Sequence, residues 1–387
     1  MAEKNTTYIC PSCGGRLEWA PSEQKLICPY CGSQYDADYF EKQEQQIGKD
    51  LEEQQYKKGE DASEQGYTSA GDATDASAED PVDLRIYHCS SCGAEIVTDK
   101  TTMATSCAFC GSPVVLAEQI DTDFRPKWIL PFGVDKKNVE DIYWDYVKSR
   151  PFTPAQFRSR SQIEKIKSVY LPFWLYDLDM QGTMSARGEQ LMTSSDSHFV
   201  YTTHQVYALE RGGRVTLNKI PVDASSRAPD DSMDSIEPFD LNGMKPFRTA
   251  YMAGYMAERY DQDEKDCYER ARQRAAYTMS GILHRSIGSF SSVEILSENV
   301  SVTDRRGAAG EKTQTEDVSG VRADYALLPV YLLFTKYQGK GYMFAVNGQT
   351  GKAVGDVPAS GGRVFLSFLL WFGILTGILY LVGWLLF

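Results

Sequence analysis

Eight of the nine cysteines in this 387-residue chain stand in CxxC pairs, and the pairs form two quartets of identical spacing. The first quartet is Cys10, Cys13, Cys28 and Cys31, and the second is Cys89, Cys92, Cys107 and Cys110. Both follow the pattern C-x2-C-x14-C-x2-C. One tight turn between two cysteines aims both sulfurs at one point, which suits the tetrahedral coordination of Zn²⁺ by thiolates. The sequence therefore predicts two four-cysteine sites with one zinc ion each.

The residues around the cysteines favour metal over disulfide bonds. Glycine follows the second cysteine of every pair, where the chain must turn sharply (Gly14, Gly32, Gly93 and Gly111). The N-terminal stretch MAEKNTTYICPSCGG lacks a secretory signal, so we expect a reducing compartment. A unit of about 30 residues cannot assemble an adequate core, so metal binding should supply most of its folding free energy. Iron in the same sulfur cage and thiol redox cycling are the alternatives.

Composition divides the chain into five regions and predicts a multidomain α+β protein. The regions are a zinc ribbon at 8–38, an acidic flexible linker at 39–84, a second zinc ribbon at 86–116, a cytosolic α+β domain at 120–357 and a transmembrane helix at 364–387. The linker is poor in large apolar residues, so it cannot bury enough surface to offset its chain entropy.

Helix and strand signals alternate in the α+β domain. Asp135 can cap a helix that ends before Pro151, and a second helix should lie within DQDEKDCYERARQRAAYTMSGILHRSIG, with Gly288 as its C-cap. The apolar stripe expected on this second helix is Tyr268, Ala271, Ala275, Met279 and Ile282. Segments such as SVYLPFWLYDLDMQGTMSA and HFVYTTHQVYALE have the composition of strands. Asn347-Gly348 predicts a two-residue hairpin turn.

The last 24 residues, 364–387, carry no charge. As a helix they would extend about 36 Å, against a hydrocarbon thickness of about 30 Å. A buried core helix is the alternative, but such helices show an apolar stripe, whereas this segment is apolar on every face. Lys352 and Arg363 precede it, which places residues 1–363 in the cytosol by the positive-inside rule. Gly373 and Gly377 form a GxxxG spacing that would allow a homodimer in the lipid bilayer.

The CPxCG knuckles resemble the zinc ribbons of general transcription factors. Together with LPFWLYD and with LLPVYLLFTKYQGKGYMFAVNGQTGKAVGDVP before the apolar tail, they make the layout resemble a poorly characterised bacterial family of tandem zinc-ribbon membrane proteins. Some members are labelled by analogy with the primosomal helicase. That resemblance implies metal binding and a membrane anchor, and no activity. NGQTGK lacks the G-x4-G-K-[ST] spacing of a phosphate-binding loop and is better explained as turns in a hairpin.

The net charge and the motifs narrow the range of possible functions. A formal net charge of −13 and ribbons with balanced charges disfavour nucleic acid as a partner. The histidines are scattered and form no hydrolase or metalloprotease motif, so we find no catalytic residue and expect no enzyme. We expect Cys267 to be a packed thiol, and Arg270, Arg272 and Arg274 to lie on a solvated helix face.

The leading hypothesis is a membrane-anchored scaffold that binds a protein partner. The alternatives are a membrane-associated nucleic-acid binder and an enzyme with an unrecognised site in 120–357.

Overall fold

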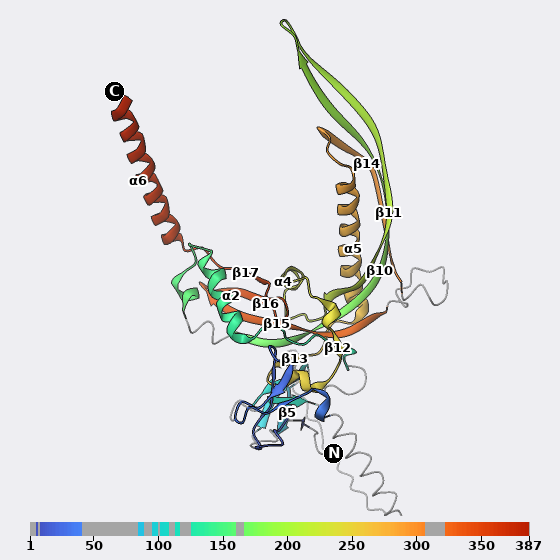
Figure 1. Cartoon of the computed structure of the whole chain (residues 1–387), viewed down its shortest axis with the longest axis vertical. Coiled ribbons are helices and arrows are strands. Elements are labelled where there is room, and N and C mark those ends of the chain that lie inside the picture. Colours follow the sequence, from blue (N-terminus) through green and yellow to red (C-terminus); the bar gives the residue numbers. More distant parts are fainter. Residues whose placement is uncertain are drawn as a thin grey trace, which may run out of the picture.

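The computed structural model describes residues 5–6, 8–40, 84–88, 95–99, 101–107, 113–116, 125–159, 166–305 and 322–386. Within them the chain is a mixed α+β protein, as the sequence predicts. A strongly curved sheet forms the base of the molecule and continues into a long, narrow arm, while one helix projects away at the C-terminal end (Figure 1). Residues 41–83, the larger part of the predicted linker, lie outside the described residues.

Twelve strands of the described residues form one sheet, and its main path runs β1-β8-β7-β13-β10-β15-β16-β17. The strands on this path are β1 (Asn5–Thr6), β8 (Pro113–Leu116), β7 (Thr102–Ser106), β13 (Met256–Glu258), β10 (Lys167–Ser195), β15 (Ala323–Tyr337), β16 (Lys340–Asn347) and β17 (Ala353–Gly355). The remaining four are β11 (Val200–Asp223), β14 (Ser292–Asp304), β9 (Trp128–Ile129) and β12 (Lys245–Pro246). Strands from both ends of the sequence thus share one sheet.

Strand β10 organises the fold because it is 29 residues long and changes partners along its length. Its first part, Lys167 to Tyr176, pairs antiparallel with β15. Its later part pairs with β14 on one side, from Leu178 to Glu189, and with β11 on the other. The first part therefore belongs to the base, and the later part forms the centre of the arm.

Helix α5 (Glu264–Ser286) supports the arm and begins at a capping box formed by Asp263 and Asp266. Its buried residues are Cys267, Ala271, Ala275, Met279 and Leu283. Three of these match the expected stripe, but Cys267 and Leu283 are buried where Tyr268 and Ile282 were expected, so the true stripe repeats at every fourth residue. The helix lies along the inner side of the arm (Figure 1). It approaches the sheet closely at Gly182, whose added Cβ would lie 2.9 Å from Leu283 Cδ1.

Helix α2 (Lys136–Lys148) begins after Asp135 and ends before Pro151, as predicted, and buries Val139, Tyr143 and Val147. It packs on the far end of the sheet, where the rings of Tyr143 and Phe344 meet edge to face at 5.1 Å. The remaining short helices are α4 (Asp230–Ser235), η3 (Ala155–Arg158), η4 (Leu241–Gly243) and η5 (Thr249–Met252).

The NGQTGK segment connects β16 to β17, so its interpretation as hairpin turns is right, although the connection is longer than two residues. Asn347 is fully buried, and its side-chain amide donates to the carbonyls of Ile236 and Pro238. Its Oδ1 accepts hydrogen bonds from the amides of Gln349 and Thr350. This loop therefore fastens the 236–238 segment to the sheet.

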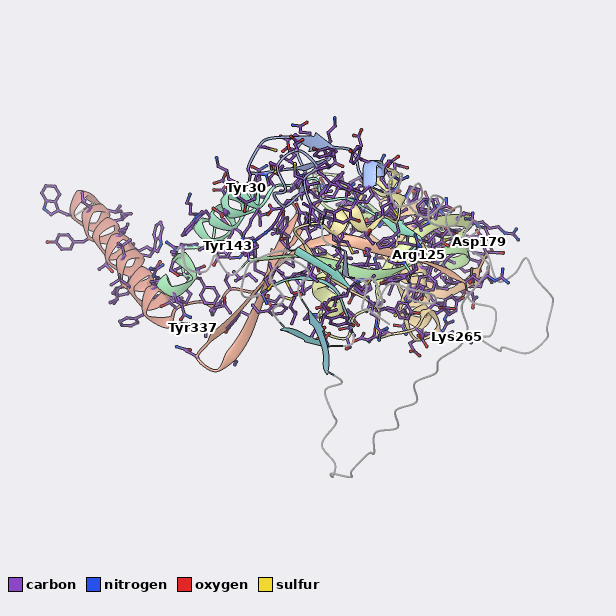
Figure 2. The ribbon with its side chains drawn as sticks, turned by 90° about the horizontal axis from the view of Figure 1, so that it is seen from below. Tyr30, Arg125, Tyr143, Asp179, Lys265 and Tyr337 are labelled. Carbon is purple, nitrogen blue, oxygen red and sulfur yellow. The ribbon has the colours of Figure 1, made fainter. Side chains whose placement is uncertain are left out.

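Helix α6 (Gly361–Leu386) is the C-terminal helix, and its stretch Gly361–Trp384 is long and apolar enough to cross a membrane. The apolar part of that stretch is not buried against the rest of the described chain, and its side chains stand clear of the body (Figure 2). Its first turn is fixed to the base, because Arg363 donates to the Thr153 carbonyl at 2.7 Å. The helix thus leaves the body at a defined point.

Candidate metal centre

The first cysteine quartet lies in a small three-stranded sheet of β2 (Glu18–Ala20), β3 (Lys25–Ile27) and β4 (Gln34–Tyr35). Cys10 and Cys13 lie in a turn before β2, and Cys28 and Cys31 lie in the turn after β3. In each turn, the first cysteine and the glycine that ends the motif are hydrogen bonded in the same way: Gly14 N donates to Cys10 O, and Gly32 N to Cys28 O, both at 2.9 Å. Gly14 and Gly32 have φ of 71° and 74°, a backbone conformation that favours glycine.

The four sulfurs of Cys10, Cys13, Cys28 and Cys31 all lie within 4.8 Å of one another, so they could hold a metal ion. The Sγ–Sγ distance is 3.6 Å for Cys10 and Cys31 and 3.5 Å for Cys13 and Cys28. A disulfide would require about 2.05 Å. A tetrahedron with metal–sulfur bonds near 2.3 Å has edges of about 3.8 Å. The separations match a metal cage and exclude disulfides.

Polar groups lie beside the sulfurs of Cys10, Cys13 and Cys31. Tyr35 Oη lies 3.7 Å from Cys10 Sγ, the amide of Gly15 donates to Cys13 Sγ at 3.4 Å, and Cys31 Sγ lies 3.2 Å from Ser33 Oγ. Burial raises the pKa of the Cys10 thiol, but its hydrogen bonds, that from Tyr35 foremost, outweigh burial and lower the pKa to about 6. Sequence reasoning missed Tyr35 and Ser33, although both follow the second knuckle directly in CGSQY.

The ribbon that carries this cage is packed onto the base. Leu17, Trp19 and Leu26 belong to the same hydrophobic core as residues of β10 and β15. The amide of Trp19 donates to the Ala253 carbonyl at 2.9 Å, and Gln24 Nε2 donates to the Phe132 carbonyl at 2.8 Å. The core of this ribbon is therefore continuous with that of the large sheet.

The second quartet falls largely outside the described residues: Cys89, Cys92 and Cys110 are among those not described. Cys107 is described, is 2% exposed and packs with Tyr87, Ile96, Val114 and Leu116. Strands β5 (Leu84–His88) and β6 (Glu95–Asp99) pair with each other, and β7 and β8 join the main sheet. The second zinc site stays a prediction.

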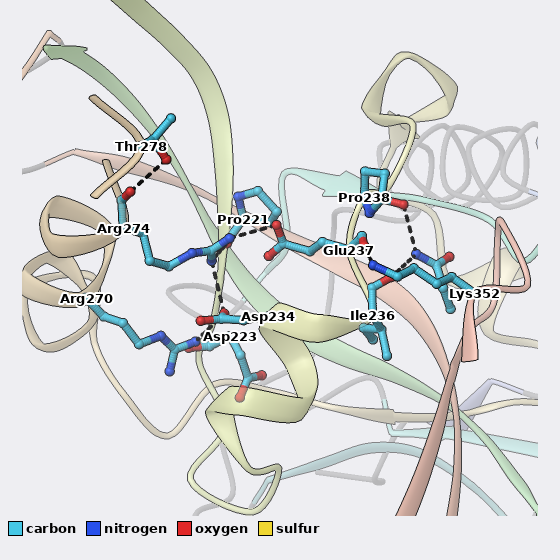
Figure 3. Close-up of polar contacts among 11 residues, drawn as sticks. Pro221, Asp223, Asp234, Ile236, Glu237, Pro238, Arg270, Arg274, Thr278 and Lys352 are labelled. Carbon is cyan, nitrogen blue, oxygen red and sulfur yellow. Dashed lines mark hydrogen bonds and ion pairs between the residues drawn. The ribbon is translucent and has the colours of Figure 1, made fainter. Parts of the chain in front are cut away.

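A second polar cluster joins α5 to α4 at the root of the arm (Figure 3). Arg274 reaches Glu237 at 2.7 Å and Asp234 at 3.0 Å, and Arg270 pairs with Asp230. Both arginines are largely covered, so the expectation of a solvated face is wrong for them; it is right for Arg272, which pairs with Glu269 at the surface. The arginine spacing could not reveal this, because the acidic partners lie on another element.

Asp223, at the end of β11, is buried beside this cluster. Burial raises the pKa of its carboxyl to about 8, although Arg270 opposes the shift. Cys267 is a buried free thiol, as expected, and burial raises its pKa to about 12. We ascribe a structural role to this cluster, since it fastens α4 and the end of β11 to the helix that supports the arm.

Comparison with known proteins leaves the family open. The chain is similar to "Uncharacterized protein YdjG" of Bacillus subtilis (strain 168), with 28% identity over 327 residues, covering 72% of this chain and 91% of that protein. No family model matches the chain, and no solved structure does. The similarity extends over the greater part of both chains, so it is not confined to the cysteine knuckles.

Proposed function

We propose that this chain is a membrane-anchored zinc-ribbon protein that binds a protein partner at the cytosolic face of the membrane and does not itself catalyse a reaction. The proposal that the chain binds a partner rests on the exposed tip of the arm. Beyond Glu189, where the pairing with β14 ends, β10 and β11 continue as a two-stranded ribbon. Its large apolar side chains are between 45% and 71% exposed: Leu191, Met192, Phe199, Val200 and Tyr201.

These side chains alternate between the two faces of the ribbon. They are costly to leave in water, and exposed apolar surface of this kind commonly marks protein interfaces. From residue 190 to 207 the sequence has one acidic or basic residue, Asp196, apart from histidines. Its carboxylate accepts hydrogen bonds from the amides of His198 and Phe199 at 2.8 and 2.7 Å, and so stabilises the turn. The tip thus offers apolar and aromatic surface on a preformed turn, which lowers the entropy cost of binding.

Affinity purification of the full chain from native membranes tests this proposal. A specific partner should be recovered with the natural protein and lost with Phe199→Ser, because Phe199 is 65% exposed at the tip. Phe334→Ser is the matched control, since Phe334 is 57% exposed but lies on β15 in the base. If both variants recover the same partner in equal amounts, the tip is not the binding surface.

We propose zinc as the metal, with one ion in each quartet. The first cage supports this with four sulfurs at separations typical of a tetrahedral site. When bound, zinc would cross-link the two turns and contribute folding free energy. Native mass spectrometry of the full chain should find two zinc ions, and Cys10→Ser should remove one. A count of zero, or absorption bands of an iron centre, would contradict this assignment.

We propose further that α6 crosses the bilayer with residues 1–363 in the cytosol. Lys352 and Arg363 near its start support this orientation, and the contact of Arg363 with the Thr153 carbonyl would hold the base close to the membrane. In sealed vesicles with the cytosolic side inward, added protease should leave the body intact, and detergent should make it accessible. Digestion of the body without detergent would show that residues 1–363 lie on the opposite side of the membrane. Gly373 and Gly377 have no neighbour within 4 Å, which leaves their face free for a second copy.

A further inference from the structure

A cavity of about 610 Å³ lies between the first ribbon and η5. Its size falls within the range of small-molecule and side-chain pockets, roughly 300–1,000 Å³. The residues that line it are Trp19, Gln24, Gln34, Tyr35, Asp36, Ala37, Asp38, Tyr39 and Tyr251. All but Tyr251 come from the ribbon and the residue that follows it, and Tyr251 of η5 completes the lining from the base.

Four aromatic rings form much of its wall. Trp19 and Tyr251 meet edge to face with centroids 4.7 Å apart, and Tyr35 and Tyr39 lie 5.1 Å apart. Trp19 and Tyr251 are 4% and 8% exposed, so packing fixes their positions, whereas Tyr39 is 37% exposed at the rim. Ring faces carry partial negative charge and attract organic cations.

The charged residues of the lining are both acidic, Asp36 and Asp38. Asp38 is paired with Arg248. The Asp36 side chain is 76% exposed. Its carboxylate lies 3.9 Å from Lys25 Nζ, which makes a weak, solvated ion pair. The Asp36 carboxylate is therefore accessible to a cationic ligand, while an anion would meet carboxylates and ring faces of the same sign. The net charge of −13 further favours a cation.

The metal cage supports one wall of the cavity. Tyr35, whose ring lines the cavity, has its hydroxyl 2.8 Å from Ser12 Oγ and 3.7 Å from Cys10 Sγ. Since Ser12 lies between two metal-binding cysteines, the ordering of the first knuckle and the position of this ring are linked. Loss of the metal should therefore disorder the cavity.

We propose that this cavity binds the ammonium or guanidinium group of a lysine or arginine side chain presented by the protein partner. This inference rests on the proposed partner-binding function and gives the partner a second contact, distant from the arm tip and dependent on charge. The ring of Tyr39 at the rim would contact the cation, and Asp36 would pair with it at the mouth.

Calorimetry with the full, metal-loaded chain in detergent micelles tests the cavity with defined probes. The peptide acetyl-Gly-Lys-Gly-amide, or its arginine counterpart, should bind, and the norleucine peptide of the same shape should bind at least about tenfold more weakly, because the cation–π term is absent. Tyr39→Ala should weaken lysine-peptide binding about fivefold, and Tyr39→Phe should restore it, since the ring supplies the attraction. Chelation of the metal should abolish binding.

Tyr30→Ala is the matched control, because Tyr30 is 70% exposed on the same ribbon and does not line the cavity. It should leave peptide binding unchanged. An unaltered metal content in each variant shows that the ribbon is folded. Equal binding of the norleucine and lysine peptides, or unchanged binding in Tyr39→Ala, would overturn the inference. If the lysine peptide binds but membranes yield no partner, the partner-binding function fails and the cation site stands.

Discussion

The two ends of strand β10 belong to one continuous strand and yet have opposite environments. From Val169 to Tyr176 every residue is buried, because odd positions such as Phe173 face the core beside α4 and even positions such as Trp174 face the core beside the ribbon. From Asp177 to Glu189 buried residues alternate with more exposed ones, and beyond Glu189 every residue is exposed. Burial thus falls in two steps, through three levels, along a single strand.

The sequence of β10 follows these steps. VYLPFWLY is apolar without interruption, as expected for a strand covered on both faces, and DLDMQGTMSARGE alternates, as expected for a strand covered on one. The difference teaches that the base is held by packing on both sides, whereas the arm depends on one helix. Substitutions along β10 should therefore have effects that decrease from base to tip.

The largest effect should come from Phe173→Ala in the base. Phe173 is fully buried and packs against Phe239 with ring centroids 6.0 Å apart. Loss of a buried aromatic side chain typically costs about 3–5 kcal/mol. Denaturant unfolding of the full chain in micelles should show this loss, and a change below about 1 kcal/mol would contradict the view that both faces are tightly packed.

A smaller effect is expected where the arm meets α5. An alanine at position 182 would place its Cβ 2.9 Å from Leu283 Cδ1 and 3.0 Å from Met279 Cε, so the helix must shift, at a cost of about 1–3 kcal/mol. Gly213→Ala, on the neighbouring β11, is the control, since nothing lies within 4 Å of its added Cβ. Hydrogen exchange in α5 should accelerate for Gly182→Ala alone. Equal rates in both variants would show that the helix tolerates the strain.

The root of the arm should make stability depend on pH. The pKa of Asp223 is raised to about 8, chiefly by burial, against about 3.9 in the unfolded chain. The protonated carboxyl therefore stabilises the fold fully below pH ~4, and this contribution falls as pH rises to ~8, by at least about 1 kcal/mol. Asp223→Asn should remove that fall, as measured by thermal unfolding between these pH values. An identical pH profile in the variant would mean that the carboxyl is already ionised in the fold.

The smallest effect is expected at the tip. Leu191 is 45% exposed, so Leu191→Ser should change the free energy of unfolding by less than about 0.5 kcal/mol. The same unfolding experiment measures it. A loss above about 1 kcal/mol would indicate that the tip packs against something, and would weaken its proposed role as a free binding surface.

The sequence predicts the local elements well. The helices α2 and α5, the strands, the turn glycines Gly14 and Gly32 and the apolar α6 follow from periodicity, caps and spacing that act over a few residues. The burial of Cys267 in place of Tyr268 shows the limit, since both fit an apolar stripe and only the sheet beneath the helix decides which one turns inward.

Contacts between distant segments were not predictable in the same way. The hydrogen bond from Trp19 to Ala253 joins residues more than 200 positions apart. No local sequence pattern predicts such a contact. The burial of Arg270 and Arg274 depends on α4 in the same manner. At the metal centre the cysteines could be identified from their spacing, but the cavity beside them could not, because its lining joins residues 19–39 to Tyr251 of the distant η5.

The pairing of β10 with β15 also sets an order of assembly in time. Residues paired between these strands lie about 150 positions apart, and such distant contacts form late. A chain growing at about 5–20 residues per second would complete the arm, which ends with β14 at Asp304, a few seconds before β15 is available. The arm would then fold before the strands of the base are complete. The strands that complete the base, β15 to β17, are thus among the last elements to be synthesised, directly ahead of α6.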